Sequence, residues 1–179
     1  MHKVKNKIIY YLPILITFIV CIFFFFSLSN DTSKLSSPII GKEVPEFSLK
    51  SLFINKNNFS SSDLYSEDPK IVNVFASWCV PCRAEHDILM LLSKLEGVQI
   101  YGLNYKDNPI EAKNFIEELG NPYINVGIDE KGRTGIDWGV YGIPESFIIH
   151  NGRVVYKHIG PIHISELEET ILPILKDLK

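Results

Sequence analysis

The sequence predicts an α/β sandwich, in which helices cover both faces of a central mixed β-sheet, together with one N-terminal transmembrane helix. Segments of β-prone residues alternate with segments of helical periodicity along most of the chain. The last two strand segments flank an Asn-Gly pair, which is typical of a hairpin, and an uncharged apolar run stands near the N-terminus. The chain of 179 residues contains no internal repeat, so one globular domain with an appendage accounts for it.

Charge and cysteine content exclude several classes of protein. The first thirty residues hold three lysines and no acidic residue, so the remainder carries 15 basic against 21 acidic side chains, a net charge of −6. An acidic body argues against nucleic acid as a partner. Three cysteines are too few for a disulfide framework, and two of them stand close together, which indicates a catalytic or metal-binding pair.

Residues 8–28 are predicted to anchor the protein in a membrane. This uncharged run has the length of about twenty apolar residues that a helix needs to cross a bilayer. It is longer than the apolar part of a signal peptide and no Ala-x-Ala site follows, although Ser27-Leu28-Ser29 leaves cleavage open. Three lysines lie within residues 1–7, which predicts a cytoplasmic N-terminus and a body on the other side of the membrane.

A polar, Ser-rich tether is predicted at residues 29–40, and the folded domain at residues 41–179. Its first half is expected to contain a strand at 47–49, a loop at 54–62, a short helix near 63–65 capped by Ser61 or Ser62, a buried strand at 71–76 and a helix at 81–95. The second half is expected to contain a strand at 98–105, a helix from Asn108 to Leu119, a strand at 124–128, a turn at 129–132, a hairpin of strands at 146–149 and 154–158, and a helix from Ser165 through Leu175 with an end that Pro173 leaves open.

Two cysteines mark the junction between the buried strand and the helix that follows it. Cys79 and Cys82 are separated by two residues, a spacing that brings their sulfur atoms within bonding distance in the first turn of a helix. Unpaired N–H groups and the positive end of the helix dipole favour a thiolate at Cys79, so its pKa is expected below that of a free thiol. The thiolate is the form that attacks a disulfide.

Trp78-Cys79-Val80-Pro81-Cys82 after a buried strand resembles the thioredoxin superfamily. Four further blocks resemble one family within it: Gly41-Lys42 with Pro45-Glu46-Phe47, Gly102-Leu103-Asn104-Tyr105-Lys106-Asp107, Gly120-Asn121-Pro122-Tyr123, and Gly139-Val140-Tyr141-Gly142-Ile143-Pro144-Glu145-Ser146. That family is DsbE/CcmG, the membrane-tethered thiol-disulfide reductases of cytochrome c maturation. The resemblance extends from about residue 41 to the C-terminus and implies a thioredoxin-like sandwich.

The resemblance implies a particular task. Proteins of this family face the periplasm from the inner membrane and reduce the disulfide in the haem-binding Cys-x-x-Cys-His segment of apocytochrome c. They act directly or through a chaperone that carries the disulfide, and a transmembrane thiol-disulfide carrier returns electrons to them. The expected protein is therefore a tethered monomer that needs no cofactor and binds no nucleic acid.

Roles for individual residues follow from the same resemblance. Cys79 is expected to be the attacking thiolate, and Cys82 the resolving thiol that breaks the mixed disulfide. Pro81 is suited to the first turn of the helix, where a missing N–H costs nothing. Trp78 is expected at the rim beside the sulfur atom, and Pro144 matches the cis-proline that helps to bind an extended substrate.

The group that exchanges protons with the cysteines remains open between three candidates. Thioredoxins carry a buried Asp six positions before the first cysteine, where this chain has Asn73, and an amide cannot accept the proton. Glu85 and Glu145 match the family best, and water is the third candidate. Glu85 could instead lie on a solvated helix face, and Glu145 could be a carboxylate at the edge of the hairpin.

Other functions compete with the reductase. Cys79, Cys82 and His86 fall along one stripe of a helix, which would suit zinc or copper, but no metal is predicted because a fourth ligand would have to come from histidines scattered over the last third. His86 is expected to pack or hydrogen-bond near the site instead. A non-catalytic module that binds apocytochrome remains possible, as does an oxidase or isomerase, because sequence alone does not fix the direction of electron flow.

Overall fold

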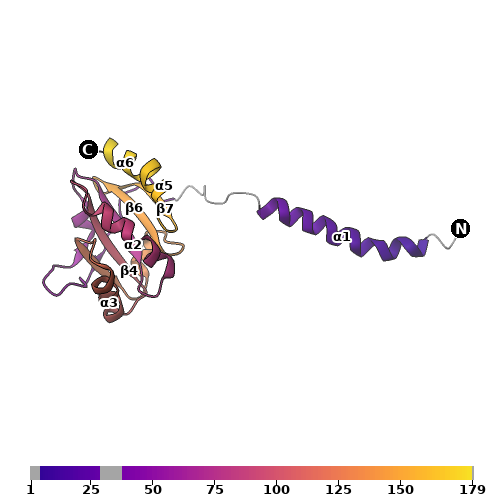
Figure 1. The fold of residues 1–179 in the computed structure, drawn as a ribbon, viewed down its shortest axis with the longest axis horizontal. Coiled ribbons are helices and arrows are strands. Elements are labelled where there is room, and N and C mark those ends of the chain that lie inside the picture. The colour runs from indigo at the N-terminus through magenta and orange to yellow at the C-terminus, as the bar shows by residue number, and fades with distance from the viewer. Residues whose placement is uncertain (1–4, 29–37, 179) are drawn as a thin grey trace. The chain divides into compact units, whose positions relative to one another are not determined.

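The computed structural model describes residues 5–28 and 38–178 of the chain (Figure 1). Contacts divide the chain into two units, Met1–Leu35 and Ser36–Lys179. Residues 1–4 of the predicted cytoplasmic segment and 29–37 of the predicted tether lie outside the described residues. Ile39 is buried in the core of the domain, so the folded part begins before residue 41.

In the first unit the structure describes α1 (Lys5–Leu28), which includes the segment predicted to cross a membrane. Its side chains are described from Tyr10 to Phe25. No helix in the described part of the chain is long and apolar enough to span a bilayer, so the anchor at residues 8–28 remains a prediction.

The second unit is built on a five-stranded mixed sheet with the strand order β5-β4-β3-β6-β7. β3 is parallel to β4 and β4 to β5, whereas β6 is antiparallel to both β3 and β7. The strands of this sheet are β3 (Lys70–Phe75), β4 (Gln99–Tyr105), β5 (Asn125–Asp129), β6 (Glu145–His150) and β7 (Arg153–Ile159). All six residues of β3 are buried, as expected for a central strand that other elements cover on both faces.

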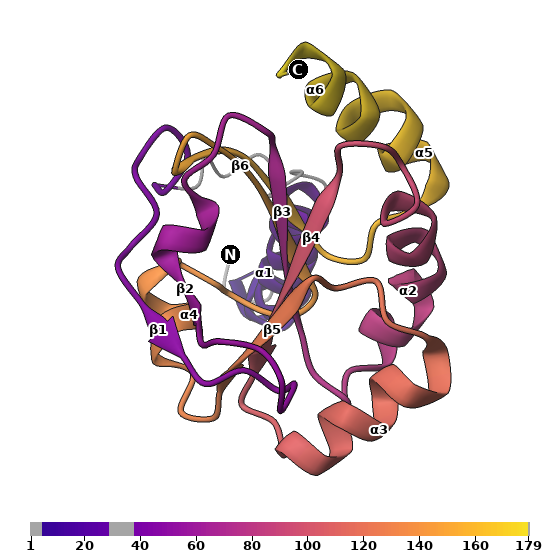
Figure 2. The same cartoon turned by 90° about the vertical axis from the view of Figure 1, so that its left-hand side faces the viewer.

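Helices lie on one face of this sheet, and a small hairpin with short helices lies on the other (Figure 2). The first face carries α2 (Val80–Leu92), α3 (Pro109–Leu119), α5 (Ile164–Glu166), the π-helical segment η3 (Leu167–Ile171) and α6 (Leu172–Asp177). The second face carries β1 (Ser48–Leu49), β2 (Phe59–Ser60), the 3₁₀ helix η2 (Ser61–Leu64) and α4 (Arg133–Asp137). The thioredoxin-like α/β sandwich predicted from the sequence is confirmed.

Most predicted elements are present, with differences at short or irregular segments. The loop expected at 54–62 contains β2, and Ser60, rather than Ser61 or Ser62, precedes η2 as its N-cap. The turn at 129–132 leads into α4, which was not expected. Pro173 does not end the last helix, because the wider π turn before it accommodates a residue that lacks an N–H and crowds a regular turn.

The order of the strands brings two distant segments to one end of the sheet. β3 runs into the loop before α2, while β6 begins beside the end of β3 because the two strands are antiparallel. Val74 pairs with Glu145, so Pro144 comes level with Phe75, the last residue of β3. The segment before β6 and the cysteine motif therefore meet at this end.

Candidate functional site

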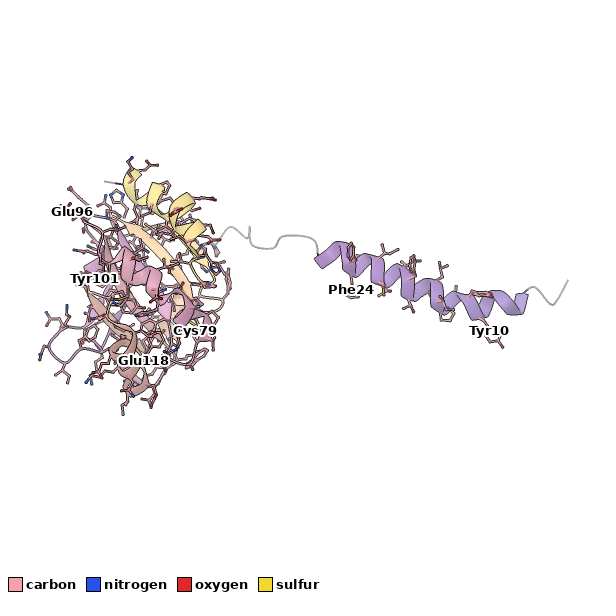
Figure 3. The ribbon with its side chains drawn as sticks, viewed as in Figure 1. Tyr10, Phe24, Cys79, Glu96, Tyr101 and Glu118 are labelled. Atoms are coloured by element: carbon pink, nitrogen blue, oxygen red, sulfur yellow. A yellow bond between two sulfur atoms is a disulfide. The ribbon has the colours of Figure 1, made fainter. Side chains whose placement is uncertain are left out.

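The two cysteines form a buried disulfide at the start of α2 (Figure 3). Cys79 is the N-cap residue of the helix, and its sulfur accepts a hydrogen bond from the backbone N–H of Cys82 at 3.1 Å. Pro81 occupies the first turn, where its missing N–H is no loss. The Cys79 sulfur thus lies at the helix N-terminus, where the dipole stabilises a thiolate after reduction.

The loop between β3 and the disulfide is fixed by the side chain of Asp107. Its carboxylate accepts hydrogen bonds from the backbone N–H and the hydroxyl of Ser77 at 2.6 and 2.7 Å, and from Asn104 Nδ2 at 2.8 Å. Trp78, 59% exposed, donates its indole N–H to the carbonyl of Lys106 at 3.1 Å. A hollow of about 420 Å³ beside Trp78 continues toward α3. No role was predicted for Asp107 from the sequence, although it belongs to a block that resembles the family.

A buried polar network lies on the face of the sheet that α2 covers. Asn73 Nδ2 donates to Glu85 Oε1 at 2.8 Å and to Ser146 Oγ at 3.0 Å, and Asn73 Oδ1 accepts from the Tyr123 hydroxyl at 2.9 Å. Glu85 Oε2 accepts from the backbone N–H of Ile162 at 2.8 Å. Both the nitrogen and the oxygen atom of the Asn73 side-chain amide are therefore hydrogen-bonded. Asn73 and Glu85 were predicted as site residues from the sequence, whereas no role was predicted for Ser146 or Tyr123.

Glu85 is the candidate proton acceptor that the structure favours. It lies three residues after Cys82 on the buried face of α2, so the alternative of a solvated helix face is wrong. Burial raises the pKa of Glu85 to about 7, while the hydrogen bonds from Ile162 and Asn73 act in the opposite direction. A carboxyl group with this pKa can both accept and return a proton near neutral pH.

Glu145 lies on the opposite face of the sheet. Its neighbour Ser146 faces Asn73, and side chains alternate along a strand. Glu145 therefore points, with Phe147, into the second core, which is the hydrophobic cluster on the face that β1, β2, η2 and α4 cover. Glu145 is fully buried there, 3.0 Å from Lys157 Nζ, and is not a carboxylate at the hairpin edge. This location separates Glu145 from the disulfide and leaves Glu85 as the carboxyl group on the cysteine side.

Pro144 follows a cis peptide bond with Ile143 and is buried. The register of β3 and β6 places it at the end of the sheet where the cysteine motif begins. The carbonyl of Pro144 accepts a hydrogen bond from the N–H of Gly160 at 3.0 Å, which fixes it against the residue that follows β7. This arrangement matches the position that the resemblance implied for the cis-proline.

His86 packs in the core beside α3. Its Nε2 lies 2.9 Å from the carbonyl of Gly120, and its ring meets the edges of Phe115 and Tyr123. Gly120 ends α3 with a φ of +94°, a conformation that favours glycine. No group of three or more His, Cys, Asp or Glu side chains among the described residues could hold a metal ion.

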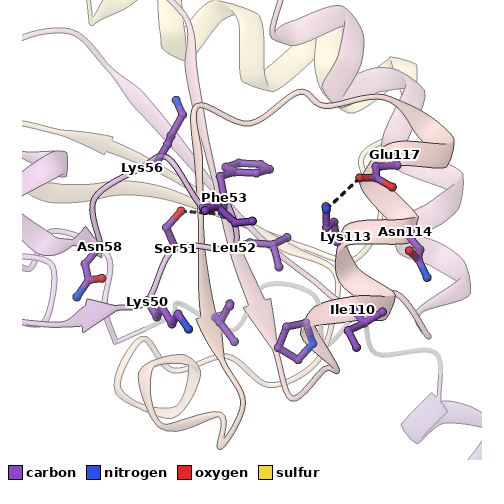
Figure 4. Close-up of a pocket in the computed structure, with 13 residues that line it drawn as sticks. Lys50, Ser51, Leu52, Phe53, Lys56, Asn58, Ile110, Lys113, Asn114 and Glu117 are labelled. Carbon is purple, nitrogen blue, oxygen red and sulfur yellow. Dashed lines mark hydrogen bonds and ion pairs between the residues drawn. The ribbon is translucent and has the colours of Figure 1, made fainter.

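A separate cavity of about 630 Å³ lies between α3 and the segment after β1 (Figure 4). The residues that line it include the apolar Leu52 and Ile110 and the basic Lys50 and Lys113. Lys113 is paired with Glu117 at 3.5 Å. None of the residues that line this cavity belongs to the cysteine motif or to the network around Glu85.

Comparison with known proteins shows the class of protein to which this fold and site belong. Residues 39–171 match the family model described as Redoxin. A buried Cys-x-x-Cys disulfide at the N-terminus of a helix, within a thioredoxin-like sandwich, defines a thiol-disulfide oxidoreductase.

Individual relatives specify the family. The thiol:disulfide interchange protein DsbE of Vibrio cholerae is 40% identical over 153 residues, which cover 85% of this chain and 82% of the relative. DsbE of Escherichia coli K12 is 43% identical over 147 residues, covering 81% and 78%. The crystal structure of a DsbE candidate from Chlorobium tepidum is similar with a TM-score of 0.64 and 29% identity, over 78% of this chain and 99% of that one. The chain belongs to the DsbE/CcmG family of thiol:disulfide interchange proteins.

Proposed function

We propose that this protein is a reductase that acts on the disulfide of the haem-binding Cys-x-x-Cys-His segment in apocytochrome c. The family supplies the direction of electron flow and the client. The observation that carries the proposal in this chain is the buried carboxyl group of Glu85, on the same helix and the same side of the sheet as Cys79 and Cys82.

The first step forms a mixed disulfide. In the reduced protein, the Cys79 thiolate attacks one sulfur of the client disulfide, and the other client sulfur leaves as a thiolate. The hydrogen bond from the Cys82 N–H and the helix dipole lower the energy of the attacking thiolate. Trp78 and the segment before Pro144 form the rim against which the client chain would lie.

The second step releases the client. Cys82 gives its proton to Glu85, and the resulting thiolate attacks the Cys79 sulfur, so that the second client sulfur leaves. The Cys79–Cys82 disulfide forms, and two electrons have passed from this pair to the client. Because its pKa is about 7, Glu85 is largely ionised above neutral pH and ready to accept the proton.

We further propose that residues 8–28 anchor the protein in the inner membrane, with residues 1–7 in the cytoplasm and the domain in the periplasm. The support is the uncharged run in the sequence, which extends at both ends beyond residues 10–25, and the lysines before it. A transmembrane thiol-disulfide carrier would then reduce the Cys79–Cys82 disulfide again at the membrane surface. A monomer suffices for this chemistry, since both sulfur atoms come from one chain.

Trapping the mixed disulfide tests the proposal. A Cys82→Ser variant cannot resolve the intermediate, so it should accumulate a covalent adduct with an oxidised Cys-x-x-Cys-His peptide that disappears on treatment with dithiothreitol. The matched Cys79→Ser variant should form little adduct, because the remaining Cys82 thiol lacks the N-cap position and the N–H hydrogen bond that favour a thiolate at Cys79. The wild-type protein, reduced beforehand, should return the peptide fully reduced.

The competing functions predict other results. An oxidase would leave the peptide oxidised and would instead oxidise a reduced peptide when its own disulfide is present. A non-catalytic module would bind the peptide equally well after both cysteines are replaced by serine. Either result would contradict the reductase.

A further inference from the structure

The segment 139–144, here called the 139–144 loop, connects α4 to β6 and ends at Pro144. It contains no helix or strand, and the side chain of Tyr141 is 67% exposed. A loop without regular structure at the end of the sheet that carries the cysteines needs other contacts to hold its shape. Two charged side chains of the second core supply those contacts.

Glu145 and Lys157 form an ion pair from which solvent is excluded. Glu145 Oε2 lies 3.0 Å from Lys157 Nζ, and the two side chains are 0% and 1% exposed. Lys157 pairs across the hairpin with Phe147, so it is the diagonal neighbour of Glu145 on the same face of the sheet. The ammonium group also lies over the rings of Tyr141 at 4.3 Å and Phe147 at 5.4 Å.

The remaining bonds of this pair go to the backbone of the 139–144 loop. Lys157 Nζ donates to the carbonyl of Gly139 at 2.8 Å. Glu145 Oε1 accepts from the N–H groups of Tyr141 and Gly142 at 3.1 and 3.4 Å. The loop is therefore tied to one buried charge pair at three backbone atoms and at the Tyr141 ring.

A requirement for stability alone does not explain this arrangement. Removing two charges from water costs free energy that their attraction often fails to recover, and apolar residues of similar volume can replace such pairs without loss. The contacts of Lys157 and Glu145 are instead directed at one loop, immediately before the residue that lies beside the cysteine motif. Their geometry therefore points to a role in setting the shape of the docking rim.

We infer that Lys157, acting with Glu145, is a positioning residue that holds the 139–144 loop in the shape in which a client chain docks beside the Cys79–Cys82 disulfide. This inference rests on the proposed function for the kind of client, a peptide that contains a disulfide. Lys157 lies on the face of the sheet opposite to the cysteines, so its loss changes docking and leaves the equilibrium between the two cysteines and their disulfide as it is.

The test compares variants in single-turnover reactions. Each protein is reduced, freed of reductant, mixed with increasing concentrations of oxidised Cys-x-x-Cys-His peptide or of insulin, and quenched with acid. The variants are Lys157→Met, the double variant Lys157→Met with Glu145→Gln, and Lys157→Arg, which keeps the charge. Lys176→Met, on the exposed last turn of α6, is the matched control.

Both Lys157→Met proteins should need about ten times more client for half-saturation, with a limiting rate within about twofold of the wild type. The equilibrium constant of the cysteine pair with glutathione should stay within about twofold of the wild type, and Lys157→Arg should recover part of the lost docking. The single variant leaves Glu145 buried and unpaired, so the double variant, which leaves no such charge, is the decisive one if the single variant does not fold.

A folded double variant with wild-type half-saturation would overturn the inference. A changed glutathione equilibrium with unchanged docking would also overturn it, since Lys157 and Glu145 would then tune the disulfide. The failure of both variants to fold would overturn it as well, since the two residues would then serve to stabilise the domain. If the wild type reduces insulin but not the haem-site peptide, the proposed client is wrong, while the role of Lys157 is still decided with insulin.

Discussion

Burial and hydrogen bonding act in opposite directions on the carboxyl group of Glu85. Burial has the larger influence and raises its pKa from 4.5 to about 7, whereas both oxygen atoms accept N–H hydrogen bonds that suit the ionised form. The group is consequently ready to change its protonation state in the range where the enzyme works. Such a group affects stability as well as chemistry.

Glu85→Gln should remove a dependence of stability on pH. In the wild type, the folded state holds this proton more tightly than the unfolded state, so the free energy of unfolding falls as pH rises from about 4.5 to about 7, by up to about 3 kcal/mol. Below this range the contribution is fully present, and above it the contribution is lost. Urea unfolding of the oxidised proteins at a series of pH values measures the difference between variant and wild type.

The same variant separates the role of Glu85 in the reaction. Resolution of the mixed disulfide should slow by about a hundredfold above pH 7, where the wild type has an ionised acceptor, and less at lower pH. Rapid quenching of the mixed disulfide with peptide measures this rate. A variant with wild-type rates across the whole range would assign proton transfer to water.

Tyr123→Phe should destabilise the domain by about 1–3 kcal/mol, because it leaves the buried oxygen of Asn73 without its donor. Urea unfolding at one pH measures this loss. Tyr65→Phe is a control with the same chemical change on a side chain that is 54% exposed, and it should change the free energy of unfolding by about 0.5 kcal/mol or less. Equal effects at the two positions would contradict the network.

Asn73 and Glu85 were both predicted as site residues from the sequence, but the hydrogen bond between them was not. Glu85 and Glu145 looked equivalent, because each stands near a motif that resembles the family. Their difference depends on which face of the sheet each side chain occupies, and therefore on the pairing of β3 with β6, whose paired residues are more than seventy positions apart. The burial of Lys157 was not predicted, since a lysine in a hairpin strand is usually exposed.

At the scale of elements, Asp107 connects the loop before α2 to the loop before α3. Besides its bonds to Ser77 and Asn104, it accepts a hydrogen bond from the N–H of Asn108, the N-cap of α3. Strands β3 and β4 are adjacent and parallel, so the loops that follow them lie next to each other. One carboxylate can therefore fix both.

Asp107→Ala should loosen both loops and lower the free energy of unfolding by about 3 kcal/mol, since a charged acceptor of several hydrogen bonds is lost. Amide hydrogen exchange at Ser77 and Trp78 should become faster while exchange in β3 follows only the global change. Asp137→Ala, an exposed acidic residue of α4, is the control. Unchanged exchange at Ser77 would contradict the proposed connection.

Long elements with clear end signals were predicted well. Asn108 caps α3, Pro109 begins it and Gly120 ends it, as expected from residues whose effects are local. The segments that were missed, β2 and α4, are short, and the π turn of η3 within the predicted last helix was not foreseen. β2 exists through pairing with β1 and packing against Phe47 and Tyr101, which no local pattern indicates.

At the scale of the whole molecule, and among the described residues, both hydrophobic clusters of the domain consist of residues from Ile39 onward. A chain of residues 36–179 should therefore unfold in urea with the midpoint of the full-length protein, and a lower midpoint would show that the first unit contributes to the fold.

Membrane attachment is a separate prediction for the full chain. Full-length protein should remain in the membrane fraction after extraction with alkaline carbonate, whereas residues 36–179 exported with a cleavable signal should be released with the periplasmic contents. Release of both proteins would contradict the anchor at residues 8–28.

We propose that the Cys79–Cys82 pair works as a reductant in an oxidising compartment. Rapid acid quenching of intact cells, followed by tagging of free thiols with a reagent of known mass, reports the state of this pair directly. If the protein is a reductase, the pair should be mostly reduced and should become oxidised when the electron supply through the membrane is removed. A pair that is mostly oxidised under all conditions would contradict the reductase and indicate that the protein forms disulfides.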